Sequence, residues 1–104
     1  MTPEPNNCAT MAEVRAGVDE IDAQIVTLLA RRFRYMDAAA RIKTSREKVR
    51  DEERKAEVIG NTKRAARELG VPEPLVAALW EMLVEYSIAY EHVKFDQGRG
   101  KINA

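Results

Sequence analysis

The chain has 104 residues, which suits a single domain, and its 17 basic side chains balance 17 acidic ones. A neutral total argues against general attraction to nucleic acids or membranes, which needs a net positive field. One cysteine, Cys8, and one histidine, His92, are too few for a disulfide framework or a metal site. No apolar run approaches the ~20 residues of a membrane span, and residues 1–10 show no secretory signal, so we expect a cytoplasmic protein.

The first predicted helix begins after Thr10, an N-cap candidate with Glu13 three residues later, and ends near residues 43–45. Residues 1–9 before it are expected to form a disordered tail. Along this helix, spacings of four and three alternate, as in a heptad-like seam. The seam comprises Val14, Val18, Ile21, Ile25, Leu28, Arg32, Tyr35, Ala39 and Ile42. A helix this long cannot fold back on itself in so small a protein, so we expect a partner chain.

The second predicted helix follows residues 44–50, which are polar, lack a period and read as a connection. Asp51 can cap the helix, and Gly70 is its stop signal after Leu69. Its apolar stripe is weak and consists of Val58, Thr62, Ala65 and Leu69.

A third helix is predicted to begin around residues 71–74, where proline suits a first turn, and to fray near residues 98–100. Its inner face is predicted to contain Val76, Leu79, Trp80, Leu83, Ser87, Tyr90 and Glu91. Strand-type alternation is absent. The predicted fold is therefore all-α, with one long and two medium helices, a folded domain over residues 10–97 and a frayed tail over residues 98–104.

Two cations interrupt the apolar pattern of the first helix. Arg32 stands in the seam, and Lys43 lies 11 residues later, which returns to nearly the same face about 16 Å away. Small residues, Ala39 and Ala40, lie between them. The pair could hold a small dianion, although long basic side chains that simply reach solvent are an open alternative.

Arg15 lies about 25 Å from Arg32 along the same helix, too far for both to serve one small pocket. An antiparallel partner helix crossing near residue 25 would bring Arg15 of one chain beside Arg32 and Lys43 of the other. That arrangement predicts two equivalent sites in a twofold homodimer.

Polar residues also interrupt the other two helices. Arg54 and Lys55 extend the stripe of the second helix with positive charge, and Ser87 and Glu91 form an i, i+4 pair on the third. Singly, Ser87 reads as a small core residue and Glu91 as a solvated one. Together they suggest a cationic pocket that contains one carboxylate, which must be paired or protonated and is therefore a functional candidate.

The pattern resembles the helical chorismate mutases over about residues 10–95. The residues that carry the resemblance are, in order, Arg15, Arg32, Lys43, Val49-Arg50-Asp51, Arg54, Ser87 and position 91. The family implies three helices per chain in an intertwined homodimer and a cofactor-free rearrangement of chorismate to prephenate, a step of the shikimate pathway toward aromatic amino acids.

The resemblance also implies residue roles. Lys43 and Glu91 would donate to the ether oxygen of the breaking bond, and Arg32 would bind a substrate carboxylate, so these three are the expected catalytic residues. The partner's Arg15 would bind the substrate as well. The full set of expected substrate-binding residues is Arg15, Arg32, Lys43, Asp51, Arg54, Lys55, Ser87 and Glu91, with no metal.

Two positions depart from the bacterial mutases, which usually carry glutamate at the position of Lys55 and glutamine at that of Glu91. The region from Cys8 to Ser45 also resembles a sister enzyme, the isochorismate-pyruvate lyase of salicylate synthesis. The motif V-R-D-x-x-R and Ser87 favour the mutase. A non-enzymatic helical dimerisation module stays open as a further alternative, and a nucleic-acid binder is disfavoured by the zero net charge.

Overall fold

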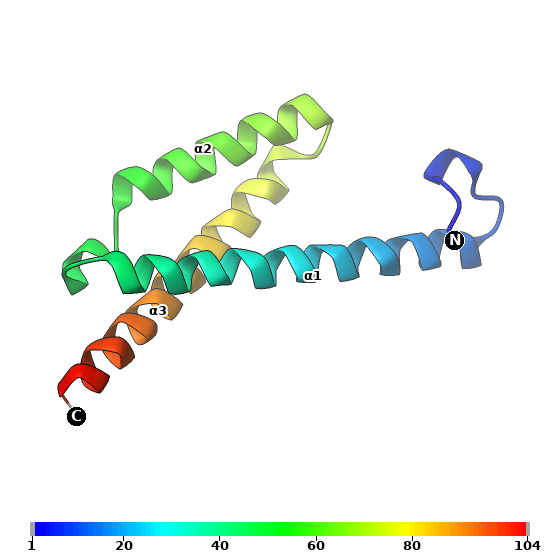
Figure 1. Ribbon diagram of the computed structural model, residues 1–104. Helices are drawn as coiled ribbons and strands as arrows, with labels where there is room; N and C mark the ends of the chain where they lie inside the picture. Colours follow the sequence, from blue (N-terminus) through cyan, green and yellow to red (C-terminus); the bar gives the residue numbers. More distant parts are fainter. Residues whose placement is uncertain (1, 104) are drawn as a thin grey trace. The chain divides into compact units, whose positions relative to one another are not determined.

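The computed structural model describes the backbone of residues 2–103 and the side chains of residues 2–99. Over this range it contains three α-helices, two short 3-10 turns and no strand (Figure 1). The predicted all-α fold with three helices is therefore confirmed. The helices are α1 (Met11–Ile42), α2 (Glu52–Leu69) and α3 (Glu73–Asn103), and the turns are η1 (Pro5–Asn7) and η2 (Arg46–Lys48). None of the described helices is long and apolar enough to cross a membrane.

The start of α1 is set by a capping box. The backbone N–H groups of Ala9 and Thr10 donate to Oε1 of Glu13 at 2.9 and 3.1 Å, and the Glu13 N–H donates to Oγ1 of Thr10 at 3.2 Å. These bonds satisfy N–H groups that a helix start leaves without intrahelical partners. Before the helix, residues 2–9 contain the single turn η1, and their expected disorder stays a prediction.

Both ends of α2 lie where the sequence predicts them. Oδ1 of Asp51 accepts a hydrogen bond from the Arg54 backbone N–H at 3.0 Å. At the other end, Gly70 has a φ of 74°, a left-handed conformation that glycine adopts without a Cβ clash. The next residue, Val71, donates its N–H to the Ala66 carbonyl at 2.8 Å, which closes a Schellman-type cap.

The helix α3 begins at Glu73, as predicted, but continues past residues 98–100, where we expected it to fray. It has 31 residues against 32 in α1, so the predicted medium length of this helix is wrong. Contacts made by Arg99 explain the difference. Its guanidinium lies 4.2 Å from the centre of the Phe95 ring, and Nη2 donates to the Lys43 carbonyl at 2.6 Å. The first contact lies within α3 and the second is tertiary, and both oppose the cost of glycine within a helix, which is about 1 kcal/mol relative to alanine.

The chain divides into two compact units, residues 1–34 and 35–104, which we describe separately. In the first unit, the seam of α1 is open to solvent. The exposed fractions of Val14, Val18, Ile21, Ile25 and Leu28 are 38%, 52%, 53%, 49% and 62%.

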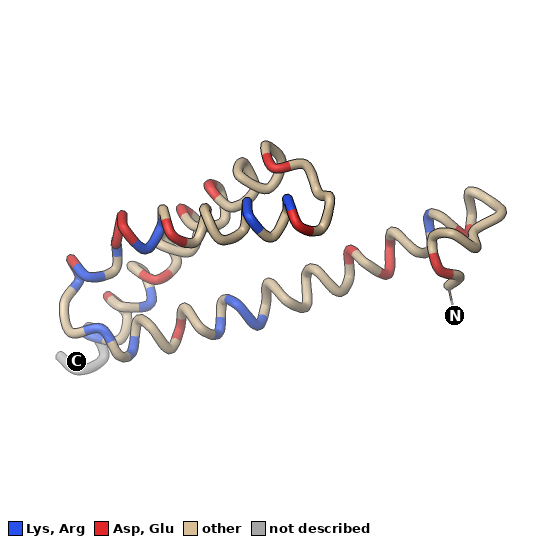
Figure 2. Tube along the Cα trace, turned by 90° about the horizontal axis from the view of Figure 1, so that it is seen from above, with Lys and Arg blue, Asp and Glu red and all other residues tan. Residues whose placement is uncertain are grey.

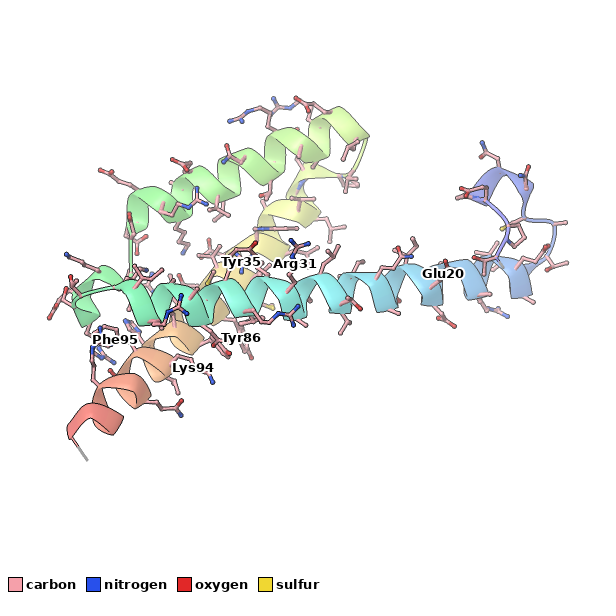
Figure 3. The ribbon with its side chains drawn as sticks, in the orientation of Figure 1. Glu20, Arg31, Tyr35, Tyr86, Lys94 and Phe95 are labelled. Atoms are coloured by element: carbon pink, nitrogen blue, oxygen red, sulfur yellow. The ribbon has the colours of Figure 1, made fainter. Side chains whose placement is uncertain are left out.

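The second unit has a small hydrophobic core built on α3, with α2 at its edge. The two helices contact each other, and Figure 1 shows them running back from the turn that joins them. The buried members of this core are Ala40, Val49, Val84, Ile88 and Phe95. Val58 and Trp80 pack against its edge. Phe95 is buried, whereas its neighbour Lys94 projects from a different side of α3 (Figure 3).

The predicted apolar stripe of α2 is partly wrong. Val58 and Thr62 are half-buried, but the next buried residue is Ala66, while Ala65 is exposed and Leu69 is 79% exposed. The more buried face of α2 therefore consists of residues spaced four apart, Val58, Thr62 and Ala66. Leu69 is the last residue of the helix, where few side chains surround it.

Candidate functional site

The centre of the candidate site is an ion pair between the end of α1 and α3. Lys43 follows the last residue of α1, and its Nζ lies 2.9 Å from Oε2 of Glu91. The Glu91 side chain is 4% exposed and that of Lys43 is 29% exposed. A buried carboxylate is costly unless it is paired, and here the lysine ammonium supplies the partner. Of the two possibilities left open by the sequence, paired or protonated, the structure describes the paired one.

Lys43 has a second partner in the connection between α1 and α2. Its Nζ donates to the backbone carbonyl of Val49 at 3.4 Å. Val49 is itself buried in the core, with 3% exposure, so its carbonyl is held in a defined place. The ammonium is therefore oriented by a carboxylate on α3 and by a backbone oxygen of the connecting segment, yet it keeps access to solvent.

Ser87 lies one turn before Glu91 on α3 and is 4% exposed. Its Oγ donates to the Leu83 carbonyl at 2.7 Å, which is a common arrangement for a serine within a helix. Ser87 and Glu91 share the inward face of α3, as the i, i+4 spacing predicts. The structure thus places Lys43, Glu91 and Ser87 in one buried region.

Asp51 and Arg54 lie at the start of α2, where both are exposed. The Asp51 carboxylate caps the helix, and the Arg54 guanidinium forms an ion pair with Glu57, one turn further along α2. In the chain as described, then, Asp51 has a structural task and Arg54 binds a neighbour on its own helix. Their expected contacts with a substrate stay predictions.

Lys55 connects α2 to α3. Its side chain is 16% exposed, and Nζ lies 2.7 Å from Oε1 of Glu81 and 2.8 Å from Oε2 of Glu85. Hydrogen bonds that Lys55 donates to Glu81 and then to Glu85 raise its pKa. The two carboxylates account for a cation at this position, because a glutamate here would face two like charges.

The sequence prediction missed the acidic partners on α3. Arg50 donates two hydrogen bonds to Glu85, from Nη1 to Oε2 at 3.1 Å and from Nη2 to Oε1 at 2.7 Å. Its Nη1 also donates to Glu52 at 2.8 Å. Hydrogen bonds from Arg50, followed by those from Lys55, lower the pKa of Glu85 from 4.5 to about 2. The i, i+4 spacing of Glu81 and Glu85 was a usable signal, but it does not name the cations opposite. Acidic and basic residues are interspersed along α2 (Figure 2).

Arg15 and Arg32 belong to the first unit, where Arg15 is exposed and Arg32 is half-buried. Their contribution to a site with Lys43 and Glu91 stays a prediction. Within the part of the chain that the structure describes, no group of three histidine, cysteine, aspartate or glutamate residues could hold a metal ion.

The described groups can act on an anionic substrate. The partly exposed ammonium of Lys43 can donate hydrogen bonds to an oxygen that gains negative charge, whereas the carboxylate paired with it only accepts. Such preorganised donors stabilise a charged transition state without a covalent intermediate. The arrangement contains the elements needed to bind and polarise a small anion.

Comparison with known proteins gives two matches. Residues 14–92 match the family described as chorismate mutase type II. The isochorismate pyruvate lyase of Pseudomonas aeruginosa is 34% identical over 96 residues, which cover 92% of this chain and 95% of the relative. Both matches span the residues on which the sequence resemblance depends, and they confirm it.

Proposed function

Because the chain belongs to the chorismate mutase type II family, we propose that it is a chorismate mutase, which rearranges chorismate to prephenate. The observation that carries the proposal is the 2.9 Å contact between Lys43 and the buried Glu91. In this rearrangement the ether C–O bond breaks and a C–C bond forms within one molecule. No nucleophile is required, so the enzyme needs to hold the compact conformer and stabilise charge on the ether oxygen.

In the proposed mechanism, Lys43 donates to the ether oxygen and to a substrate carboxylate. Its access to solvent lets a substrate approach, and the Val49 carbonyl keeps the ammonium oriented. In the free chain Glu91 accepts from Lys43, so in the proposed mechanism the bound substrate replaces Glu91 as the partner of the ammonium. Glu91 then donates to the ether oxygen from the other side as a protonated carboxyl, because an ionised one only accepts. Ser87 and the start of α2, with Asp51 and Arg54, complete the binding region.

We also propose that the active protein is a homodimer with shared sites. The row of exposed apolar residues on α1, from Val14 to Leu28, is the face that a second copy would cover. In this arrangement Arg15 of one chain and Arg32 of the other bind the substrate carboxylates. A twofold dimer would contain two such sites.

A second candidate activity is the elimination of pyruvate from isochorismate. It is favoured by the 34% identity to the Pseudomonas aeruginosa lyase over nearly the whole of both chains. Breaking the ether bond of isochorismate places negative charge on the same type of oxygen, so the same cations would serve. The motif V-R-D-x-x-R and Ser87 support the mutase as the main activity.

The deciding experiment incubates the purified protein with chorismate and, separately, with isochorismate. Prephenate from chorismate supports the mutase, whereas salicylate and pyruvate from isochorismate support the lyase. A Lys43→Gln variant should be inactive in the productive assay, while Lys63→Gln, at an exposed lysine of α2, should match the unmodified protein. If neither substrate reacts, the chain is not an enzyme of this type and the helical dimerisation module is favoured.

A further inference from the structure

The carboxylate of Glu85 on α3 accepts hydrogen bonds from two cations, Arg50 and Lys55. Arg50, just before α2, binds both of its carboxylate oxygens at 3.1 and 2.7 Å. Lys55, in the first turns of α2, donates to Oε2 at 2.8 Å and is also held by Glu81 at 2.7 Å. One carboxylate on α3 therefore fixes residues on both sides of the Asp51 cap.

These contacts adjoin the residue that orients Lys43. Val49 directly precedes Arg50, and its carbonyl accepts the hydrogen bond from Lys43 Nζ at 3.4 Å. Because consecutive residues share a planar peptide, the position of Arg50 restricts where the Val49 carbonyl points. Glu85 is thus linked to Lys43 through one side chain and one peptide group.

Stability alone does not explain this arrangement well. The side chains of Arg50 and Glu85 are 41% and 39% exposed, and ion pairs that solvent reaches contribute little to folding. Their two-bond geometry instead defines an orientation, which a single contact between flexible side chains would not.

We propose that Glu85 is a positioning residue of the active site, which acts through Arg50 and Lys55 to hold the Val49 carbonyl and the start of α2 in place around Lys43. Glu85 itself does not touch the substrate. The inference rests on the proposed function, since it concerns the geometry of the same site.

The chain contains a matched control pair. Arg67 and Glu73 also join α2 to α3 by two bonds, at 3.1 and 2.9 Å, but at the opposite end of α2. Hydrogen bonding to Arg67 lowers the pKa of Glu73, as Arg50 does for Glu85. The control pair is likewise a two-bond contact between an arginine and a glutamate, although it uses Nε and Nη2 of the arginine, and it has no link to Val49.

The test is a double-mutant cycle in each pair, assayed on whichever of chorismate and isochorismate the unmodified protein turns over. Glu85→Ala and Arg50→Ala should each lower kcat about tenfold, with a smaller change in KM, since misplaced catalytic groups lose rate. The double variant should be no slower than Glu85→Ala, because Arg50 is proposed to act through its contact with Glu85, which the single variant has already lost. Glu73→Ala, Arg67→Ala and their double variant should stay within about twofold of the unmodified protein.

Hydrogen exchange provides a readout that does not depend on turnover. Amides of residues 46–55 should exchange faster in Glu85→Ala but not in Glu73→Ala, because only Glu85→Ala removes contacts between this segment and α3. Glu85→Gln, which keeps the shape and one acceptor, should fall between the unmodified protein and Glu85→Ala in both measurements.

The possible failures are distinguishable. Faster exchange with unchanged kcat would overturn the positioning role and leave the proposed function intact. An equal loss of kcat in the Arg67 and Glu73 variants would also overturn the positioning role, because the loss would then come from a general decrease in stability. An unmodified protein that converts neither substrate would overturn the proposed function and the positioning role together.

Discussion

The seam of α1 and the inner face of α3 follow similar spacing rules but lie in different environments. Val18 and Ile21 of α1 are 52% and 53% exposed, whereas Val76 and Ser87 of the predicted inner face of α3 are 7% and 4% exposed. That prediction is partly wrong, because Leu79 is 49% exposed and the buried face also includes Val84 and Ile88, at 7% and 9%. The face of α3 is covered by α2 and by residues 40 and 49 of the same chain. The comparison shows that apolar periodicity predicts that a helix face is buried. It does not tell whether the same chain or a second chain covers that face.

Polar residues interrupt both faces. Arg32 stands in the seam of α1, and Glu91 stands in the inner face of α3, where Lys43 pairs with it. Hydrophobic residues of similar volume often pack as well as a buried ion pair, so the pair is weak support for stability. A role in binding and catalysis is the better explanation for a Lys43–Glu91 pair in a packed face. The predictions below test that explanation for α3 and for the seam of α1.

The largest expected effect is on Lys43. Replacement by glutamine removes the charge that stabilises the ether oxygen, so kcat should fall about 10³-fold in the assay that shows activity. Circular dichroism should show unchanged helix content, and Lys63→Gln provides the exposed control. A normal kcat with a lower Tm would show that Lys43 stabilises the fold and does not take part in catalysis. The explanation of the Lys43–Glu91 pair by function would then be wrong.

Charge introduced into the seam should separate the proposed dimer. Ile21→Asp places a carboxylate on the face that a second copy would cover, so sedimentation should detect a monomer, with most activity lost because each site is shared. Val26→Asp is the matched control, since Val26 lies on α1 outside the seam and is 64% exposed. A monomeric unmodified protein with full activity would contradict the shared-site arrangement.

Mixing two inactive variants tests sharing directly. In a mixed dimer of Arg15→Ala and Lys43→Ala chains, one site contains both mutations and the other contains neither. Random exchange makes half of the dimers mixed, so activity should return to about a quarter of the unmodified level. Native mass spectrometry should verify that chains have exchanged; activity that stays absent from exchanged dimers would show that each site uses one chain.

Glu91→Gln should have a smaller effect. Glutamine keeps the volume and supplies an amide donor to the ether oxygen, so kcat/KM should stay within about tenfold of the unmodified protein. Glu91→Leu removes the donor and should lose activity, and Tm should fall because Lys43 is left without its carboxylate partner. Equal activity in the leucine variant would assign Glu91 to structure.

The smallest expected effect concerns stability in acid. The pKa of Glu85 is lowered in the folded protein from 4.5 to about 2, so the unfolded chain binds more protons in that interval. The stabilisation is complete above pH 4.5 and is lost as the pH falls toward 2. The Tm difference between the unmodified protein and Glu85→Gln should shrink over this range, whereas a constant difference would mean that Glu85 is not paired in solution.

Several helix ends were predictable because local residues determine them. Thr10 with Glu13, Asp51, and Gly70 each act on backbone groups within about four residues, and the structure shows all three caps. The i, i+4 relation of Ser87 and Glu91 was predictable for the same reason. The end of α3 was not, since it depends on Arg99 reaching the Lys43 carbonyl, more than fifty residues away.

The sequence by itself determined the all-α fold and the start of each helix, and it predicted Lys43 and Glu91 as site residues. Only the tertiary structure decided that these two residues pair, that Lys55 binds Glu81 and Glu85, and that Arg50 binds Glu85. The physical reason is the distance along the chain between the interacting residues. Caps and periodic faces arise from bonds along a single helix, whereas the pairing of side chains between helices depends on how each helix is rotated and placed when the core packs.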